Sequence, residues 1–373
     1  MTSLPVQCET RELASGRCLG IATLDSERSL NALTLDMVDC LLPQLAAWAA
    51  DERVVMVLLR GRGERAFCAG GDVRRLTEFA RSGEGDALAA GHFFAREYRL
   101  DYAIHQFPKP LLVWGSGIVM GGGMGLWMGA RFRVVTETTR MAMPEISIGL
   151  FPDVGGSYFL SRLPGRFGLY LGLTAQHFNG ADALALGLAT DQLSSSDWQP
   201  LLDDLAGLAW SADAAEHADQ VQAVLRARAS SAPASALLSR EDAIEAVCAH
   251  ADLVTLDAVW RDVVPEQDWL AKAMSTYRAG SPTSAALVWQ QWHRGSRQSL
   301  AQVFRDEWRI ATHCAARHDF PEGVRALLID KDQQPRWQPA TLAEVTPAWL
   351  AGFDQVPAGH ALPLDDLEAC YGS

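Results

Sequence analysis

The apolar positions of the first 190 residues follow two spacings, which predict alternating strands and helices. The run VVMVLL at residues 54–59 is apolar without a break, as is typical of a strand buried on both faces of a sheet. Residues 34–50 place apolar side chains at helical spacing and begin with a threonine that can cap a helix. We also predict strands at residues 18–24, 110–114 and 132–136, and a helix at residues 93–105.

The pattern changes after Gln192. The run SSSD at residues 194–197, followed by Pro200, predicts a linker or a capped loop. From about residue 201 to 316 the sequence is rich in Ala, Leu and Arg at helical spacing, and only the run SSAPAS at residues 230–235 interrupts it. We therefore expect an α/β core over residues 1–203 and a mainly helical C-terminal region over residues 204–373.

Residues 111–130 carry no charge and imitate a membrane span, with glycines at the four-residue spacing of a transmembrane dimer face. The stretch holds seven glycines, three of them consecutive, and each costs a helix about 1 kcal/mol relative to alanine. A buried strand, a tight turn and a buried helix fit these residues better, so we expect no membrane partner.

Composition narrows the class of protein. The 373 residues include 32 basic and 45 acidic side chains, giving a net charge of −13, and 49% are apolar. This balance is typical of a soluble globular protein and argues against a nucleic-acid partner, which would require a basic face.

Cysteines and the N-terminus bear on the compartment. Seven cysteines, an odd number without a CxxC pair, indicate reduced thiols rather than a disulfide framework or a zinc ribbon. The first sixteen residues lack an apolar segment behind a basic start, and they contain Glu9 and Glu12. From these features we expect a cytoplasmic protein.

Several motifs of other enzyme classes are missing from the sequence. The glycines around residues 115–123 do not fit the dinucleotide pattern GxGxxG, because Met120 stands where the third glycine belongs. The sequence contains neither a GK[ST] phosphate loop nor a GxSxG nucleophile elbow. Cys314 and His318 lie four residues apart, but two ligands do not complete a metal site, and we expect no metal.

Two glycine-rich turns follow predicted strands, AFCAGGD at residues 66–72 and MGGGMG at residues 120–125. Glycine lets backbone N–H groups approach a ligand closely, and two such donors on one oxygen would form an oxyanion hole. Ordinary tight turns between strand and helix explain the same residues, so both interpretations remain open here.

Two carboxylates lie in the apolar stretch MPEISIGLFPDVGG at residues 143–156. Glu145 and Asp153 each follow a proline. An apolar environment disfavours the charged form of a carboxyl group, which makes both residues candidate acids or bases. Proline followed by an acidic residue is also common where a helix or turn begins, so a purely structural role remains open.

Taken together, these three phrases resemble the crotonase superfamily of acyl-CoA enzymes in their order and spacing. Two further stretches, residues 94–98 and 318–332, together with the run SPTS at residues 281–284, resemble the branch that hydrolyses 3-hydroxyisobutyryl-CoA in valine breakdown. The resemblance runs from about residue 22 to 340 and is weakest between about 205 and 275.

The resemblance implies a crotonase-type spiral of ββα units with a helical C-terminal region, and a coenzyme A thioester as ligand. The backbone N–H groups of Gly71 and Gly122 would form the oxyanion hole, and Glu145 maps onto the catalytic carboxylate. Glu97 and Asp153 map onto other acids that contact substrate. The full set of implied residues is Glu145, Asp153, Gly71 and Gly122 for catalysis and Glu97, Ala69, Asp72 and Gly122 for substrate binding.

These residues are consistent with hydrolysis of a short-chain 3-hydroxyacyl-CoA, with Glu145 as general base or as nucleophile. The alternatives are an enoyl-CoA isomerase or hydratase, or a CoA-binding protein without activity. Coenzyme A would be part of the substrate, with no separate cofactor, and a homo-oligomer is possible.

Two features qualify the resemblance. Hydratases of the superfamily use two glutamates, and Gly125 stands at the position of the first, which disfavours alkene hydration.

Residues 53–75 hold six arginines against two acids, a local charge of +4 beside the first glycine turn. Arginine binds phosphate well, so we expect coenzyme A affinity to depend on salt and on Arg74 and Arg75.

Overall fold

The structure is a computed structural model that describes residues 4–81, 86–357, 359 and 361–371. The chain divides into two compact units that are interleaved along the sequence. The first unit comprises Met1–Gly71, Leu100–Met141 and Phe178–Ser239, and the second comprises Asp72–Arg99, Ala142–His177 and Arg240–Ser373.

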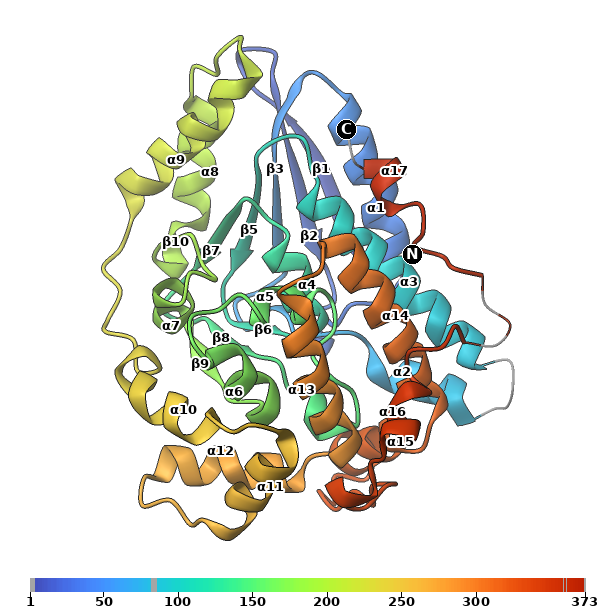
Figure 1. Ribbon diagram of the computed structural model, residues 1–373. Helices are drawn as coiled ribbons and strands as arrows, with labels where there is room; N and C mark the ends of the chain where they lie inside the picture. Colours follow the sequence, from blue (N-terminus) through green and yellow to red (C-terminus); the bar gives the residue numbers. More distant parts are fainter. Residues whose placement is uncertain (1–3, 82–85, 358, 360, 372–373) are drawn as a thin grey trace. The chain divides into compact units, whose positions relative to one another are not determined.

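The first unit is built on two sheets. Six strands form the larger sheet in the order β1-β2-β3-β5-β7-β10, in which β1 and β2 are antiparallel and the other neighbours are parallel (Figure 1). The smaller sheet has the order β4-β6-β8-β9. The strands are β1 (Val6–Glu12), β2 (Cys18–Leu24), β3 (Val54–Gly61), β4 (Ala66–Cys68), β5 (Leu111–Gly115), β6 (Ile118–Met120), β7 (Phe132–Val135), β8 (Arg140–Ala142), β9 (Phe178–Asn179) and β10 (Asp191–Gln192).

Consecutive strands alternate between the sheets. In each of the pairs β3–β4, β5–β6 and β7–β8, the first strand joins the larger sheet and the second joins the smaller one. A helix follows the second pair directly, α4 (Gly122–Met128). This alternation is the predicted spiral of ββα units, and the comparisons below confirm the fold class.

Local sequence explains the elements around the larger sheet. All but one residue of β3 is buried, as the unbroken apolar run requires. Helix α1 (Leu35–Ala50) begins where predicted, because the Thr34 side chain accepts a hydrogen bond from the Met37 N–H. The unit's other helices are α7 (Gly180–Ala185), α8 (Trp198–Gly207) and α9 (His217–Arg228).

The core of this unit lies between the larger sheet and the helices α8 and α9. Leu58, Leu112 and Val134 from three neighbouring strands are fully buried in one cluster with Leu205 and Leu225. Pro200 lies inside the first turn of α8, where a missing N–H costs nothing. The predicted break at residues 194–200 is therefore a capped turn that leads into a helix.

The second unit is helical. Among the described residues after β10 the chain contains helices and no strand, as predicted. The helices are α2 (Val73–Arg81), α3 (Asp86–His105, whose last turns belong to the first unit), α5 (Gly156–Leu160), α6 (Phe167–Thr174), α10 (Glu241–Cys248), α11 (Leu253–Asp262), α12 (Asp268–Ala279), α13 (Pro282–Gly295), α14 (Leu300–Ala316), α15 (Asp319–Val324), α16 (Pro347–Ala351) and α17 (Leu367–Tyr371).

The uncharged stretch at residues 111–130 folds as predicted into strand, turn and helix, namely β5, β6 and α4. In the part of the chain that the structure describes, no helix combines the length and apolar character needed to cross a membrane. Helix α3 begins at Asp86, earlier than predicted. The predicted boundary at residue 203 falls inside α8, and the division into an acyl-CoA core and a C-terminal region stays a prediction.

Candidate active site

The first glycine turn follows β4 in the first unit. Gly70 has φ +111°, a backbone conformation that residues with a side chain rarely adopt. The turn is fixed by two backbone hydrogen bonds, from the Ala69 N–H to the Leu30 carbonyl at 3.1 Å and from the Leu33 N–H to the Gly70 carbonyl at 2.8 Å. Gly71 forms a parallel bridge with Leu33 at this point.

The second glycine turn follows β6, which pairs with β4. Gly121 has φ +48° and caps α4, whose first residue is Gly122. The first N–H groups of a helix have no partner inside it, so the Gly122 N–H is available to a ligand. A Cβ on Gly123 would lie 2.3 Å from the Cys68 carbonyl oxygen, so only glycine allows α4 to approach β4 this closely.

The two glycine turns are in contact. A Cβ on Gly70 would lie 3.4 Å from the Met120 carbonyl oxygen and 3.8 Å from the Gly122 nitrogen. Within the described residues, no hydrogen bond uses the N–H of Gly71 or of Gly122. The structure thus brings these two predicted donors onto adjacent turns, an arrangement that suits an oxyanion.

The second unit carries the predicted acids Glu97, Glu145 and Asp153, which are buried, and Asp72, which is partly exposed. Glu97 lies on α3, Glu145 begins the short 3-10 turn η2 (Glu145–Ile148), and Asp153 lies in the turn before α5. Their side chains are at most 4% exposed. Burial raises the pKa of Glu97 and of Glu145 well above the usual range, and the nearby charge of Asp153 raises both further.

Asp153 has a defined partner. The Tyr98 hydroxyl donates a hydrogen bond of 2.5 Å to the Asp153 Oδ2. Burial raises the pKa of Asp153 to about 6, and the bond from Tyr98 opposes that rise because it stabilises the charged form. Burial and the Tyr98 hydroxyl thus act on the pKa of Asp153 in opposite directions.

Glu97 and Glu145 differ from Asp153. In the described part of the chain, Glu97 Oε1 and Glu145 Oε2 are buried and have no hydrogen-bond partner. A buried carboxyl oxygen without a partner is costly, and contact with a substrate or a water molecule would supply the missing hydrogen bond. This observation supports contact roles for both residues.

Packing from the C-terminal helices shapes the turn at Glu145. A Cβ on Gly149 would lie 2.4 Å from the Asp319 backbone, and one on Gly323 would lie 2.5 Å from the Ile148 backbone. The backbones of η2 and α15 are thus in direct contact. The Asp319 carboxylate accepts the Ser281 hydroxyl at 2.6 Å and the Gln338 N–H at 2.7 Å. Two sequence stretches that carried the resemblance, residues 281–284 and 318–332, therefore support the turn of Glu145.

Sequence reasoning missed a fourth buried carboxyl group, Glu307 on α14, which is 0% exposed. Its Oε2 accepts the Gly155 N–H at 2.7 Å and its Oε1 accepts the Ser157 N–H at 2.8 Å. Burial raises its pKa to about 8, although both bonds oppose this. The available signal was an acid on the apolar face of a predicted helix, four residues before Ala311 and three after Phe304.

Ala69 and Asp72 remain predicted coenzyme contacts. Ala69 is partly exposed beside the first glycine turn, and the Asp72 side chain accepts a hydrogen bond from the Arg75 N–H at the start of α2. The Arg74 guanidinium is exposed and donates to the Leu328 carbonyl. These placements leave the roles of the three side chains in binding a coenzyme as predictions.

Of the six arginines counted in the basic stretch, Arg53 and Arg62 form ion pairs with acids outside it among the described residues. Arg53 forms an ion pair with Asp51 at 2.9 Å, and Arg62 forms one with Asp25 at 3.1 Å. The local charge of +4 is therefore partly neutralised in the folded chain.

The fold, the two glycine turns and the buried acids together identify the protein family. The chain belongs to the enoyl-CoA hydratase/isomerase family, whose sequence profile matches residues 19–353. The predicted acyl-CoA partner is consistent with this family.

Curated proteins with similar sequences carry the name of one enzyme. The chain is 40% identical over 330 residues to the mitochondrial 3-hydroxyisobutyryl-CoA hydrolase of Danio rerio, covering 88% of this chain and 84% of that protein. It is 38% identical over 334 residues to the enzyme of the same name from Homo sapiens, with the same coverage of both chains.

Solved structures confirm the predicted α/β crotonase fold. A carnitinyl-CoA dehydratase from Mycobacterium thermoresistibile superposes with a TM-score of 0.84 at 35% identity, covering 97% of this chain and 99% of that one. An enoyl-CoA hydratase from Rhodobacter sphaeroides superposes with a TM-score of 0.82 at 33% identity, covering 95% and 98%.

The cytoplasmic location predicted from the sequence is wrong. The relatives are named mitochondrial, which points to mitochondria rather than the cytoplasm. The prediction rested on Glu9 and Glu12 near the start of the sequence and on reduced cysteines. Neither property selects one compartment, because a folded protein can keep its thiols reduced wherever the surroundings are reducing.

Proposed function

We propose that the protein hydrolyses 3-hydroxyisobutyryl-CoA to 3-hydroxyisobutyrate and coenzyme A, a step of valine breakdown. The single observation that carries this function is the 38–40% identity to hydrolases of that name over about nine-tenths of the chain. The buried acids Glu97, Glu145 and Asp153 and the adjacent donor turns give the chain the groups that such a hydrolysis requires.

The chemistry assigns each group a role. Attack on a thioester places negative charge on the carbonyl oxygen, and in our proposal the N–H groups of Gly71 and Gly122 receive it. Loss of one oxyanion donor typically costs about 10²–10³ in kcat. The proposed chemistry needs no separate cofactor, since coenzyme A leaves as the thiol product.

Glu145 has two possible roles in this proposal. As a general base it removes a proton from water, which attacks the thioester carbon and expels the thiolate. As a nucleophile it forms a mixed anhydride, which water then hydrolyses. Both routes require ionised Glu145, so they proceed through the deprotonated fraction of a carboxyl group whose pKa burial raises; among the described residues its Oε2 has no hydrogen-bond partner. Asp153 and Glu97 would orient water or the 3-hydroxyl group.

Alkene hydration is the second candidate, because the two solved structures named above carry dehydratase and hydratase titles at 33–35% identity. Helix α4 argues against it. Its sequence, GGMGLWM, places Gly125 where the resemblance expects the first hydratase glutamate, and it contains no acidic residue.

Release of free thiol from 3-hydroxyisobutyryl-CoA tests the function. Wild-type protein should release thiol, and Glu145→Gln should lower kcat by about 10²–10⁴-fold, the usual contribution of a positioned acid or base. Glu137→Gln, at an exposed glutamate, is the matched control and should keep full activity. No release by the wild type, or full activity of Glu145→Gln, would refute the proposal.

The oligomeric state stays a prediction. A homo-oligomer was expected as possible, and sedimentation of the purified chain would decide it.

A further inference from the structure

The turn that carries Asp153 has an unusual backbone. Val154 has φ +53° and Gly155 has φ +84°, so two consecutive residues adopt the left-handed conformation. Valine is branched at Cβ and strongly disfavours this region. Such a turn persists only where its surroundings fix it.

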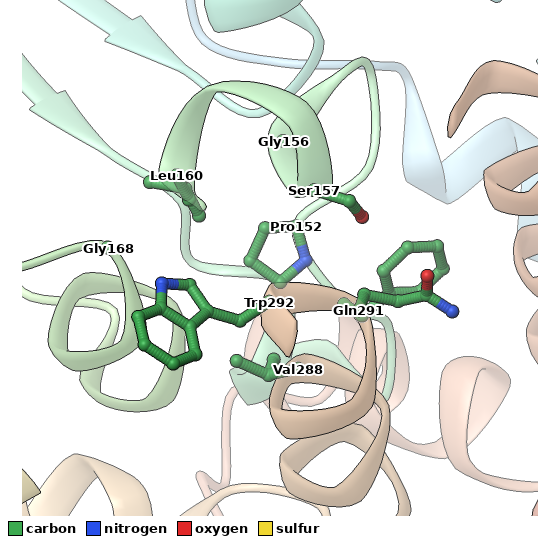
Figure 2. A pocket seen from close by; sticks show the side chains of 9 residues that line it. Pro152, Gly156, Ser157, Leu160, Gly168, Val288, Gln291 and Trp292 are labelled. Atoms are coloured by element: carbon green, nitrogen blue, oxygen red, sulfur yellow. The ribbon is translucent and has the colours of Figure 1, made fainter. Parts of the chain in front are cut away.

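Packing leaves room beside this turn. A cavity of about 10 Å³, comparable to one water molecule, lies against Pro152, Gly156 and Ser157. Figure 2 shows these residues at the cavity together with Gln291 and Trp292 of α13. On this side the turn therefore borders a water-sized void rather than continuous packing.

The other support is Glu307. Its two carboxylate oxygens accept the N–H groups of Gly155 and Ser157, which flank Gly156, and the Gly156 N–H bonds the Asp153 carbonyl. One side chain thus fixes both ends of the segment that follows Asp153. A carboxylate holding one N–H on each oxygen sets the orientation of both amides.

Stability alone does not account for this glutamate. Among the ion pairs of the described residues none includes Glu307; its hydrogen-bond partners are the neutral groups of Gly155 and Ser157, and the nearby charge of Asp153 disfavours its ionised form. Burial raises its pKa to about 8, while the N–H groups of Gly155 and Ser157 favour the ionised form, in which both oxygens accept. An apolar side chain of similar size would cost less, but it would leave the two N–H groups without an acceptor.

We propose that Glu307 is a positioning residue for hydrolysis: through the amides of Gly155 and Ser157 it holds the turn that aims the Asp153 carboxylate. The inference rests on the proposed function for its effect on activity. Its structural part, that Glu307 fixes the turn, is measurable without any substrate.

Glu307→Gln is the decisive variant. The amide matches the carboxylate in size but presents an NH₂ group to one of the two donors, so it keeps at most one bond. We expect kcat for thiol release to fall about 10–100-fold, as for a misplaced catalytic group, while KM stays within about threefold. Thr312→Val is the matched control: Thr312 is buried on the same helix, its hydroxyl bonds only the Trp308 carbonyl among the described residues, and kcat should be unchanged.

Hydrogen exchange provides the second measurement. The amides of residues 153–157 should exchange faster in Glu307→Gln than in the wild type or in Thr312→Val. Glu307→Asp keeps the charge on a shorter side chain, and its kcat should lie between those of the wild type and Glu307→Gln. If Glu307→Gln does not fold, Glu307→Asp tests whether Glu307 positions the turn.

The outcomes separate the two proposals. A wild type without hydrolase activity refutes the function, while the exchange rates still decide whether Glu307 fixes the turn. Unchanged kcat and exchange in Glu307→Gln, or equal losses in Thr312→Val, would overturn the positioning role. A change in KM alone would also overturn it, since the role predicted concerns catalysis rather than binding.

Discussion

The buried carboxyl groups of Glu97, Glu145, Asp153 and Glu307 differ in their partners, and these differences suggest different roles. Asp153 accepts a hydrogen bond from Tyr98, and Glu307 accepts two from backbone amides. Glu97 and Glu145 each keep one oxygen without a partner among the described residues. Environments that separate the pKa values of neighbouring acids are typical of a site that assigns acid and base roles.

Tyr98→Phe tests the role of Asp153. The hydroxyl stabilises the ionised carboxylate, so its loss should raise the pKa of Asp153 above its value of about 6. If ionised Asp153 is required, the acidic limb of the kcat profile should move to higher pH by about one pH unit, the contribution of one hydrogen bond to a charge. A limb that stays in place or moves to lower pH would contradict this role.

The sequence revealed these residues unequally. Glu145 and Asp153 were visible as acids in an apolar stretch, because their neighbours fixed the environment locally. Glu97 was identified only through the family resemblance. Glu307 was missed because its partners, Gly155 and Ser157, lie about 150 residues earlier in the chain, and helical spacing alone does not show which buried acid finds such partners.

Among the elements, the close contact between η2 and α15 is the feature most sensitive to change. Gly323→Ala would place a Cβ 2.5 Å from the Ile148 backbone, which cannot move as a flexible side chain would. We expect a loss of about 1–3 kcal/mol in the free energy of unfolding, measured in urea, and reduced kcat because the turn of Glu145 shifts.

Gly207→Ala provides the control for that substitution. Gly207 ends α8, and a Cβ added there would meet no atom within 4 Å, so alanine should be neutral or slightly stabilising. A Gly323→Ala protein as stable as Gly207→Ala would show that the contact tolerates a methyl group.

Long elements were predictable and short ones were not. The apolar run of β3 and the capped pattern of α1 indicated both elements directly. Strands β4 and β6 have three residues each, too few to show a spacing, although they carry the glycine turns. Strand β1 was missed because most of its side chains are exposed, so no apolar run marks it.

For the whole molecule, the buried acids predict how stability depends on pH. Burial raises the pKa of Asp153 from 3.8 to about 6 and that of Glu307 from 4.5 to about 8. Between the two values of each group the native state holds a proton that the unfolded chain has released. The free energy of unfolding should therefore fall as pH rises.

Melting temperatures across pH test this sign. We expect the melting temperature to decrease from about pH 5 to pH 8, and Glu307→Gln, which cannot titrate, to remove the part of the decrease that Glu307 contributes between about pH 4.5 and 8. A melting temperature that rises over this range, or a Glu307→Gln protein with the wild-type slope, would contradict the burial of these charges.

Sequence patterns could not predict that the two units are interleaved along the chain. Hydrophobic spacing can divide a chain only into consecutive segments, and here it suggested one boundary near residue 203. Each unit instead collects three separate segments, because the strands of one sheet and the helices of one cluster come from distant parts of the chain.

A comparison of two substrates distinguishes thioester hydrolysis from alkene hydration. Equal amounts of the same purified protein are given 3-hydroxyisobutyryl-CoA, with free thiol followed, and crotonyl-CoA, with loss of its enoyl absorbance followed. We expect thiol release from 3-hydroxyisobutyryl-CoA and no hydration of crotonyl-CoA, because α4 has Gly125 in place of an acid. Hydration of crotonyl-CoA without thiol release from 3-hydroxyisobutyryl-CoA would contradict this expectation.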